Sequence, residues 1–313
     1  MANSSTSERQ LVGSADDIWI WSQDNGWDLT RAPTHDAKPE MRPLHLSCEI
    51  SNVTIDPAKT ALIIIDMQNY TMCKELRPDT AVPALFAAQD TLLKYGIPAA
   101  RKAEIQIIWL NWGLTQKDLG TMPPSALRVF GWKANNDVAD CISARVAAPG
   151  REETFINCGE RPRTVGIGAE LGQLEFQDGT KVDAGRVLMR ESWNAAIHGP
   201  LLSSFQESQS GPKPDILIHK NRNSGLWSET SDLAEYLAID GIRTLLFTGA
   251  NTDQCVMATL QDAHARGFDT ILLKDGCATD SPGYAQQSAE FNCCRNWGFL
   301  SSCRALSQAA FGD

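Results

Sequence analysis

The chain has 313 residues, 42% of them hydrophobic and 21% charged, which is the composition of a globular protein with a sizeable core. A formal net charge of -10 and a sequence pI near 5.0 argue against nucleic acid or an anionic membrane surface as a partner. The 9 cysteines are odd in number and irregularly spaced, without a CxxC pair, so we expect reduced thiols and neither a disulfide framework nor a zinc site.

The first ten residues are polar and lack the apolar segment of a signal peptide, and no apolar run in the chain approaches membrane length. We therefore expect a cytoplasmic protein that does not enter a membrane.

Residues 1–50 differ in composition from the rest of the chain and are expected to form an N-terminal arm. They carry Trp19, Trp21 and Trp27, followed by a stretch dotted with prolines. Residues 18–21 read as a short strand. We expect this arm to pack on the core or on a neighbouring subunit, in preference to acting as a separate binding module.

A buried strand opens the globular domain, which we place at residues 51–313. Residues 60–66 are mostly apolar and end in an acid, a pattern typical of a central parallel strand that is buried on both faces. Apolar residues then recur at helical spacing over 82–93, and Gly96 is expected to end that helix. The next predicted strand covers residues 105–110.

The segment from about 113 to 190 is rich in glycine, proline and charged residues, and its apolar runs are broken. We interpret it as a loop insertion, of a length usually connected with a lid, binding loops or disorder. Residues 135–187 follow no recognisable pattern, so the role of the insertion stays open.

Strands and helices alternate again in the second half of the chain. Alternation of this kind specifies a parallel sheet with right-handed crossovers, so we expect an α/β fold, a three-layer α/β/α domain. The expected strands are 215–220, 244–248, 270–274 and an edge strand at 298–300, and the expected helices are 232–239, 251–267, 282–291 and a last one that runs to Phe311.

Cys255 lies in the first turn of the helix that follows the strand at 244–248. Unpaired backbone N–H groups and the positive end of a helix dipole lower the pKa of a thiol and can hold a developing oxyanion. A free cysteine is also among the residues most often buried in a core. From this stretch alone, a nucleophile and a core cysteine are equally good interpretations.

Asp66, Lys220 and Cys255 each end or follow a different predicted strand. In an open parallel sheet, ligands bind beyond the carboxyl ends of the strands, so the fold directs all three toward one crevice. A carboxylate that takes the thiol proton, an ammonium that stabilises the thiolate, and helix-terminal amides that receive the oxyanion suit nucleophilic hydrolysis. A single acid or lysine at a strand end more often belongs to a surface ion pair. The evidence for a catalytic site is therefore that all three residue types occur together.

Three motifs at these positions resemble the isochorismatase-like cysteine hydrolases, and within them the ureidoacrylate amidohydrolase group. They are Ile63–Gln68, Lys220 with Ser224–Thr230, and Thr248–Thr259. Further likeness to that group lies in Ile107–Trp109, Ser192–Trp193 and Gly283–Asn292 followed by Trp297. The resemblance extends from about residue 57 to the C-terminus and leaves the arm outside.

The resemblance implies a six-stranded, mainly parallel sheet with Asp66, Lys220 and Cys255 as a catalytic triad. It also implies a cis peptide bond between Ala250 and Asn251, which places the backbone N–H groups of Asn251 and Cys255 in an oxyanion hole. A homo-oligomer, either a dimer or a tetramer, is expected from the family as well.

One departure from the family concerns metal binding. The nicotinamidase relatives carry an Asp-x-His-type metal cluster just after the second strand, where this chain has Asn111–Leu114 and no histidine. We therefore expect no metal and no cofactor, and nicotinamide is not favoured as a substrate.

The candidate substrate-binding residues are aromatic or amide side chains near the expected crevice. Aromatic walls with a few polar groups suit a small planar substrate. Taken singly, each tryptophan among them is more often a core residue, and Trp227 is the best exception. The candidates are Tyr70, Asn111, Trp112, Trp193 and Trp227.

These features favour a cysteine-dependent amidohydrolase that cleaves a C–N bond of a small amide, ureido or carbamoyl substrate through a thioester on Cys255. One alternative is an isochorismatase-type hydrolase of a vinyl ether, a reaction that does not need the cysteine. The other is a non-catalytic binding protein on the same fold, a role that would not require the three residue types together.

Overall fold

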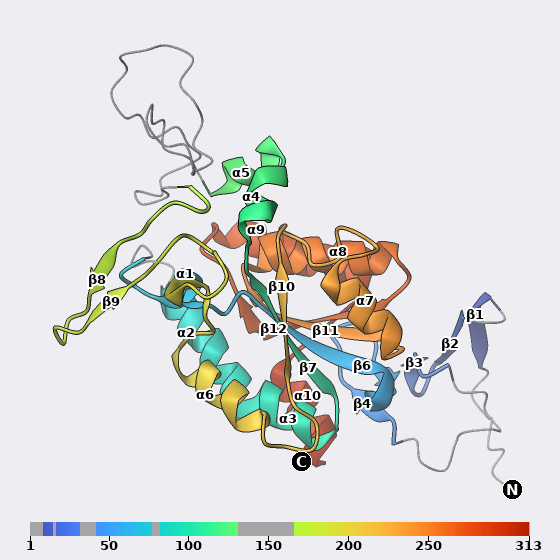
Figure 1. Cartoon of the computed structure of the whole chain (residues 1–313). Coiled ribbons are helices and arrows are strands. Elements are labelled where there is room, and N and C mark those ends of the chain that lie inside the picture. Colours follow the sequence, from blue (N-terminus) through green and yellow to red (C-terminus); the bar gives the residue numbers. More distant parts are fainter. Residues whose placement is uncertain (1–8, 15–16, 32–41, 77–81, 131–165, 313) are drawn as a thin grey trace, which may run out of the picture.

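The computed structural model describes residues 9–14, 17–31, 42–76, 82–130 and 166–312, and its centre is one six-stranded sheet (Figure 1). Every neighbouring pair in this sheet is parallel, in the order β10-β7-β6-β11-β12-β13. The predicted α/β fold is confirmed. The strands are β6 (Thr60–Ile65), β7 (Gln106–Trp112), β10 (Ile216–Lys220), β11 (Thr244–Ala250), β12 (Asp269–Ala278) and β13 (Phe299–Ser301).

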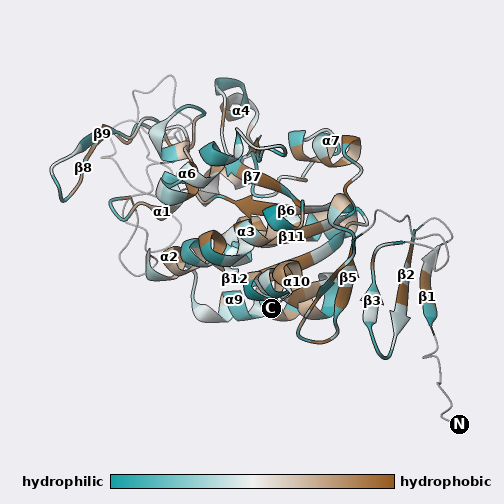
Figure 2. Cartoon of the chain, turned by 90° about the horizontal axis from the view of Figure 1, so that it is seen from below, coloured by the Kyte–Doolittle hydropathy of each residue, from teal (hydrophilic) through white to brown (hydrophobic). Residues whose placement is uncertain are grey.

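The middle strands are apolar because they are covered on both faces. Alternate residues of β6 belong to different cores: Ile63 and Ile65 pack in one cluster, and Leu62 and Ile64 in the other. Figure 2 shows the hydrophobic colouring of the central strands. A strand with apolar residues on both faces can only be buried in this way.

Two sets of helices form the outer layers (Figure 1). The face of Leu62 and Ile64 is covered by α2 (Val82–Thr91), α3 (Ile97–Lys102), α6 (Gly199–Ser208) and α10 (Cys303–Phe311). The face of Ile63 and Ile65 is covered by α7 (Asp232–Ile239), α8 (Met257–Ala265) and α9 (Gly283–Asn292). The molecule therefore has the three layers that the alternating pattern predicts.

The helix expected to end at Gly96 continues beyond it. After α2 the chain passes through a π-helical turn at Leu92–Gly96 and runs on as α3. Pro98 lies in the first turn of α3, directly after the π-helical turn, and has no backbone N–H to donate to the turn before it. Gly96 keeps helical dihedral angles, so it does not act as a C-cap here. Helix α6 was not expected from the sequence.

The N-terminal arm contributes to a second sheet of five strands. Its order is β1-β2-β3-β5-β4. The short strand expected at 18–21 is part of β2, and the other strands were not expected. The bounds are β1 (Gln10–Ser14), β2 (Asp17–Ser22), β3 (Gly26–Asp28), β4 (Leu44–Leu46) and β5 (Val53–Ile55).

Asp269, at the start of β12, anchors the arm to the core. Its carboxylate accepts hydrogen bonds from Trp19 Nε1 at 2.9 Å and from Arg31 Nη1 and Nη2 at 2.7 and 2.8 Å. The Asp269 side chain is buried, so this bidentate ion pair is well shielded from water. The arm thus packs on the amino end of the sheet.

The region from 113 to 190 holds short elements where the sequence predicts a loop insertion. They are α4 (Gln116–Thr121), α5 (Pro124–Val129), β8 (Gln173–Glu175) and β9 (Lys181–Asp183). Residues 131–165 lie outside the described part of the chain. Helix α4 begins with a capping box between Thr115 and Asp118, which explains how six residues hold a helix.

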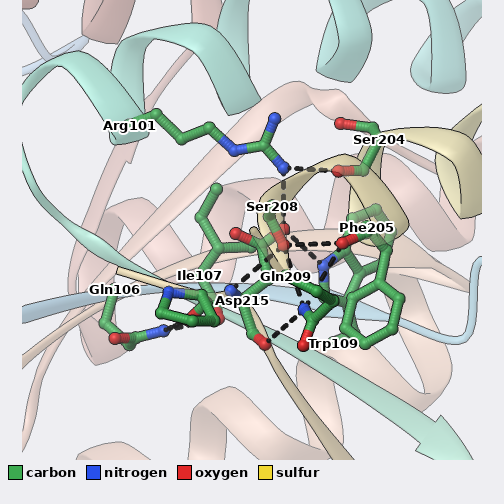
Figure 3. A network of polar contacts seen from close by, with 10 residues as sticks. Arg101, Gln106, Ile107, Trp109, Ser204, Phe205, Ser208, Gln209 and Asp215 are labelled. Carbon is green, nitrogen blue, oxygen red and sulfur yellow. Dashed lines mark hydrogen bonds and ion pairs between the residues drawn. The ribbon is translucent and has the colours of Figure 1, made fainter. Parts of the chain in front are cut away.

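A buried polar network fixes the edge strand β10 (Figure 3). The carboxylate of Asp215, next to the first residue of β10, accepts hydrogen bonds from Arg101 Nη2 at 2.9 Å and Trp109 Nε1 at 3.0 Å. Its backbone N–H donates to Ser208 Oγ at 3.2 Å. Helices α3 and α6 and strand β7 are therefore tied to β10, which sets the register that places Lys220 at its other end.

Within the described residues, the helices are all too short or too polar to span a bilayer.

Candidate active site

The structure brings Asp66, Lys220 and Cys255 together at the carboxyl edge of the sheet. Asp66 follows β6, Lys220 ends β10, and Cys255 lies in a π-helical turn, Thr252–Val256, after β11. Strand order reverses between β6 and β11, and this is where ligands bind in open α/β sheets. The three residues are 3%, 4% and 8% exposed, so they form a buried polar group.

Asp66 is held by two neighbours. Its Oδ2 lies 2.9 Å from Lys220 Nζ, and its Oδ1 accepts a hydrogen bond from the backbone N–H of Trp112 at 3.0 Å. The backbone of Asp66 is left-handed, with φ of 52°, an uncommon conformation for a residue other than glycine. Ion pair and backbone together fix one orientation of this carboxylate.

Lys220 lies between the carboxylate and an indole ring. Its Nζ is 3.9 Å from the centroid of the Trp112 ring and donates a hydrogen bond to the carbonyl oxygen of Arg222 at 3.2 Å. The face of an aromatic ring attracts a cation, most strongly where water is excluded. Trp112 therefore contacts the ion pair twice, through its backbone and through its ring.

Close packing of β11 against β6 brings Cys255 next to Asp66. Gly249 has φ of 108°, and a Cβ at this position would lie 2.1 Å from the carbonyl oxygen of Ile65. A larger residue would push the two strands apart just before Asp66. With glycine there, Cys255 and Asp66 line the same pocket, close enough for each to affect the pKa of the other.

The pKa of Cys255 differs from the sequence expectation. Burial raises the pKa of this thiol to about 12, an effect that Lys220 opposes and Asp66 reinforces. The net shift is upward, opposite to the lowered pKa expected for a thiol at a helix terminus, because desolvation of the buried thiolate is the largest effect. Burial also raises the pKa of Asp66, against the opposing effects of Lys220 and of the hydrogen bonds to the carboxylate.

A small pocket opens beside the three residues. It has an aromatic wall, formed by Tyr70, Trp112 and Phe130, and a polar side. Phe130 lies with its ring centroid 5.1 Å from that of Trp112 and 6.2 Å from that of Tyr70. The lining consists of Asp66, Tyr70, Thr71, Trp112, Phe130, Leu188, Asn223, Ala250, Asn251, Gln254 and Cys255. The cavity is small, with a volume of about 30 Å³.

The peptide bond between Ala250 and Asn251 is cis, as the resemblance implies. Both residues line the pocket next to Cys255. The side chain of Asn251 is held outside the ion pair, with Nδ2 donating to Asp280 Oδ1 at 2.9 Å. Asn251 and Cys255 thus line the same pocket.

Three of the expected substrate-binding residues lie outside this lining. Asn111 alternates with Trp112 on β7 and so points to the opposite face of the sheet, where it is buried. The Trp193 ring packs on Phe176 at 5.9 Å. Trp227 is 48% exposed, and its Nε1 donates to Asn221 Oδ1. Tyr70 and Trp112 do line the pocket.

Sequence reasoning missed several lining residues. Gln254 adjoins Cys255, and Asn223 directly precedes the motif that begins at Ser224, so this nearness was an available signal. Phe130 and Leu188 come from the region interpreted as a loop insertion, where no periodicity marks them.

Comparison with known protein sequences agrees with the resemblance. Residues 176–292 match the family model described as Isochorismatase domain. A ureidoacrylate amidohydrolase from Stutzerimonas stutzeri is 27% identical over 270 residues, covering 85% of this chain and 89% of that protein. A ureidoacrylate amidohydrolase from Agrobacterium fabrum is 26% identical over 264 residues, covering 82% of this chain and 94% of that protein.

Solved structures show the same fold. A cysteine hydrolase from Pseudomonas syringae pv. phaseolicola has a TM-score of 0.54 at 17% identity, covering 87% of this chain and 98% of that chain. An isochorismatase family protein from Desulfovibrio vulgaris has a TM-score of 0.51 at 17% identity, covering 79% of this chain and 96% of that chain.

The predicted resemblance to the isochorismatase-like hydrolases is confirmed by the family match and the curated relatives, and the solved structures share the fold. The predicted enzyme class, a hydrolase of non-peptide C–N bonds, agrees with the names of both curated relatives.

Proposed function

From this resemblance to the isochorismatase-like hydrolases, we propose that the protein is a cysteine-dependent amidohydrolase of a small amide, ureido or carbamoyl compound. The observation that carries the proposal is the pair of Asp66 and Lys220, 2.9 Å apart, beside a buried thiol at a pocket. A carboxylate, an ammonium and a thiol in contact are the groups that a thiol-based acyl transfer needs.

In the first step, the Cys255 sulfur attacks the substrate carbonyl carbon and its proton passes to Asp66. Burial raises the pKa of this thiol to about 12, so the resting thiol is protonated at neutral pH and has to give up its proton to Asp66 in this step. The raised pKa of Asp66 makes this carboxylate a stronger base than an exposed one. Lys220 keeps the carboxylate oriented toward the sulfur through the ion pair.

The carbonyl oxygen becomes an oxyanion during this attack. The backbone N–H groups of Asn251 and Cys255 are the proposed donors, since both residues line the pocket beside the sulfur. Asp66 then returns its proton to the leaving nitrogen, the C–N bond breaks, and the amine or ammonia departs. The acyl group remains on Cys255 as a thioester, or as a thiocarbamate when it comes from a ureido group.

Hydrolysis of this intermediate completes the cycle. Asp66 takes a proton from a water molecule, the oxygen attacks the carbonyl carbon, and the S–C bond breaks. The sulfur recovers the proton from Asp66, which restores the resting ion pair with Lys220. One carboxylate thus acts first as base and then as acid in each half of the cycle, which a raised pKa favours.

The substrate class is proposed from the pocket and the relatives together. The aromatic wall of Tyr70, Trp112 and Phe130 suits a flat apolar part, and the amides of Asn223 and Gln254 suit a polar carbonyl group. Both curated relatives are named ureidoacrylate amidohydrolases, so ureido acids stand first in the panel of compounds to test.

The test is an assay of small amides, ureido acids and carbamoyl compounds for release of ammonia. We expect wild-type protein and the Cys294→Ala variant to be active, because Cys294 lies outside the pocket lining. The Cys255→Ala variant should lose several orders of magnitude in kcat, as loss of a nucleophile does elsewhere. Isochorismate is included with a pyruvate readout. Release of pyruvate by both cysteine variants, without ammonia from any amide, would overturn the proposal.

A further inference from the structure

A second cavity lies at the opposite edge of the sheet, where the N-terminal arm meets the core. Its volume is about 380 Å³, within the range of small-molecule pockets, roughly 300–1,000 Å³. Lys59 directly precedes β6, and Thr244 begins β11, the strand whose far end leads to Cys255. The lining consists of Leu29, Thr30, Arg31, Asp56, Lys59, Gly241, Arg243 and Thr244.

The walls of this cavity are fixed by strong interactions. Arg31 forms a bidentate pair with buried Asp269, and Thr244 Oγ1 donates to the same carboxylate at 2.8 Å. The backbone N–H of Arg243 donates to the carbonyl oxygen of Lys59 at 2.8 Å. Lys59 and Arg243 therefore project from two neighbouring strand starts that are hydrogen-bonded to each other. A ligand would meet a site that is already formed.

Two cations in this cavity have no acidic partner among the described residues. Lys59 and Arg243 are exposed and form no ion pair there, whereas Arg31 is occupied by Asp17 and Asp269. The acid in the lining is Asp56, whose Oδ1 accepts a hydrogen bond from the backbone N–H of Ala58. Unpaired cations that converge on one cavity are unexpected in a chain with 38 acidic and 28 basic residues.

Gly241 leaves room for the Lys59 ammonium at the rim. Its φ is 61°, and a Cβ there would lie 3.1 Å from Lys59 Nζ. A side chain at 241 would be strained in this left-handed conformation, which follows the end of α7. Gly241 thus lies beside the Lys59 ammonium at the rim of the cavity.

From this arrangement we propose that the cavity is a binding site for a small anion that carries a phosphate or carboxylate group. Lys59 and Arg243 bind the anionic group, and Arg31 forms the back of the site without giving up its pair with Asp269. Planar guanidinium and compact ammonium groups both recognise such anions by charge-assisted hydrogen bonds. This site is separate from the pocket at Cys255 and does not depend on the proposed reaction.

The experiment is isothermal titration of the full chain with inorganic phosphate and, separately, with malonate. Lys59→Gln, Arg243→Gln and the double variant are compared with wild type at matched ionic strength, because exposed charges are screened by salt. Lys213→Gln is the matched control, since its ammonium is also exposed and donates to a backbone oxygen, that of Glu104. Both test side chains are exposed, so these variants are expected to fold.

We expect saturable binding of at least one anion to wild type and to the control. Each single substitution should raise Kd by about tenfold, because a charged hydrogen bond to the anion is lost. The double variant should show no detectable binding. Binding of phosphate but not malonate identifies a phosphate-bearing ligand, and binding of malonate but not phosphate identifies a carboxylate-bearing one. Binding of both anions identifies a site that recognises negative charge. Absence of binding to wild type, or equal binding to the double variant, would overturn the proposal.

Discussion

Lys220 is stacked on Trp112, with Nζ 3.9 Å from the ring centroid, while the backbone N–H of the same tryptophan donates to the carboxylate that pairs with Lys220. Trp112 therefore supports both members of the ion pair, and one face of its ring is occupied by the lysine. This relationship makes it a positioning residue as well as part of the pocket wall.

Replacement of Trp112 tests this positioning role. A desolvated cation–π contact contributes about 2 kcal/mol, so Trp112→Leu should lower kcat/KM by about 30-fold. Trp112→Phe keeps a ring under the ammonium and should lose less than Trp112→Leu. Both variants retain the backbone N–H to Asp66. In a plot of kcat/KM against pH, the acid limb should shift in Trp112→Leu and not in Trp112→Phe. If Trp112 acted only through packing, the pH dependence of kcat/KM would be unchanged in both variants.

Loss of the lysine should expose the cost of a buried carboxylate. In Lys220→Met, the Asp66 charge lacks its partner, which destabilises a protein by about 3–5 kcal/mol. The pKa of Asp66, already raised above 3.8, rises further. A carboxyl with a raised folded-state pKa binds its proton more tightly in the folded protein, so stability is lost as pH rises through that pKa. Chemical denaturation should therefore show a deficit at pH 7 that shrinks toward pH 4.

The double variant Asp66→Asn with Lys220→Met is the control for the predicted stability loss of Lys220→Met. Residues in direct contact are coupled, so its loss of stability should be smaller than the sum of the two single losses. Additive losses would mean that the ion pair contributes nothing to the fold.

Alkylation rates should reflect the raised pKa of Cys255. Burial raises this pKa to about 12, so little thiolate is present at pH 8, and the partly exposed Cys294 should react with iodoacetamide first. The labelling rate of Cys255 should keep rising above pH 9. Peptide mapping by mass spectrometry after timed quenching gives both rates. Preferential labelling of Cys255 at pH 7 would instead support a standing thiolate.

Phe130 should affect substrate binding more than chemistry. Its ring packs on Tyr70 and Trp112 and contacts no reacting group, so Phe130→Ala should raise KM by about tenfold and leave kcat within a few-fold. It should also admit bulkier substrates, since the present cavity of about 30 Å³ is narrow. Phe176→Ala is the matched control, because that ring pairs with Trp193 outside the pocket. An equal change in KM in the two variants would show that Phe130 has no specific role in substrate binding.

Much of the central fold was predictable because it depends on local patterns. Buried strands such as β6 and β11 are apolar runs with a turn residue or acid at the end, and the helix Asp232–Ile239 was predicted with its observed bounds. The five-stranded sheet of the arm was largely missed, since its strands are short and pair with segments distant in sequence.

The site was predictable in its polar centre and less so at its walls. Parallel strand ends converge by topology, which brought Asp66, Lys220 and Cys255 together without any need for side-chain detail. Wall residues depend on which face a side chain takes, and the one-residue step between Asn111 and Trp112 decides this. The direction of the Cys255 pKa shift depended on burial, which sequence spacing does not report.

The most direct test of the proposed chemistry is intact-mass spectrometry of the protein, acid-quenched during turnover of a substrate that the assay identifies. The account predicts a substrate-derived acyl adduct that maps to Cys255, absent from Cys255→Ala, which has also lost activity. Full turnover by Cys255→Ala, or an adduct that maps to another residue, would contradict it.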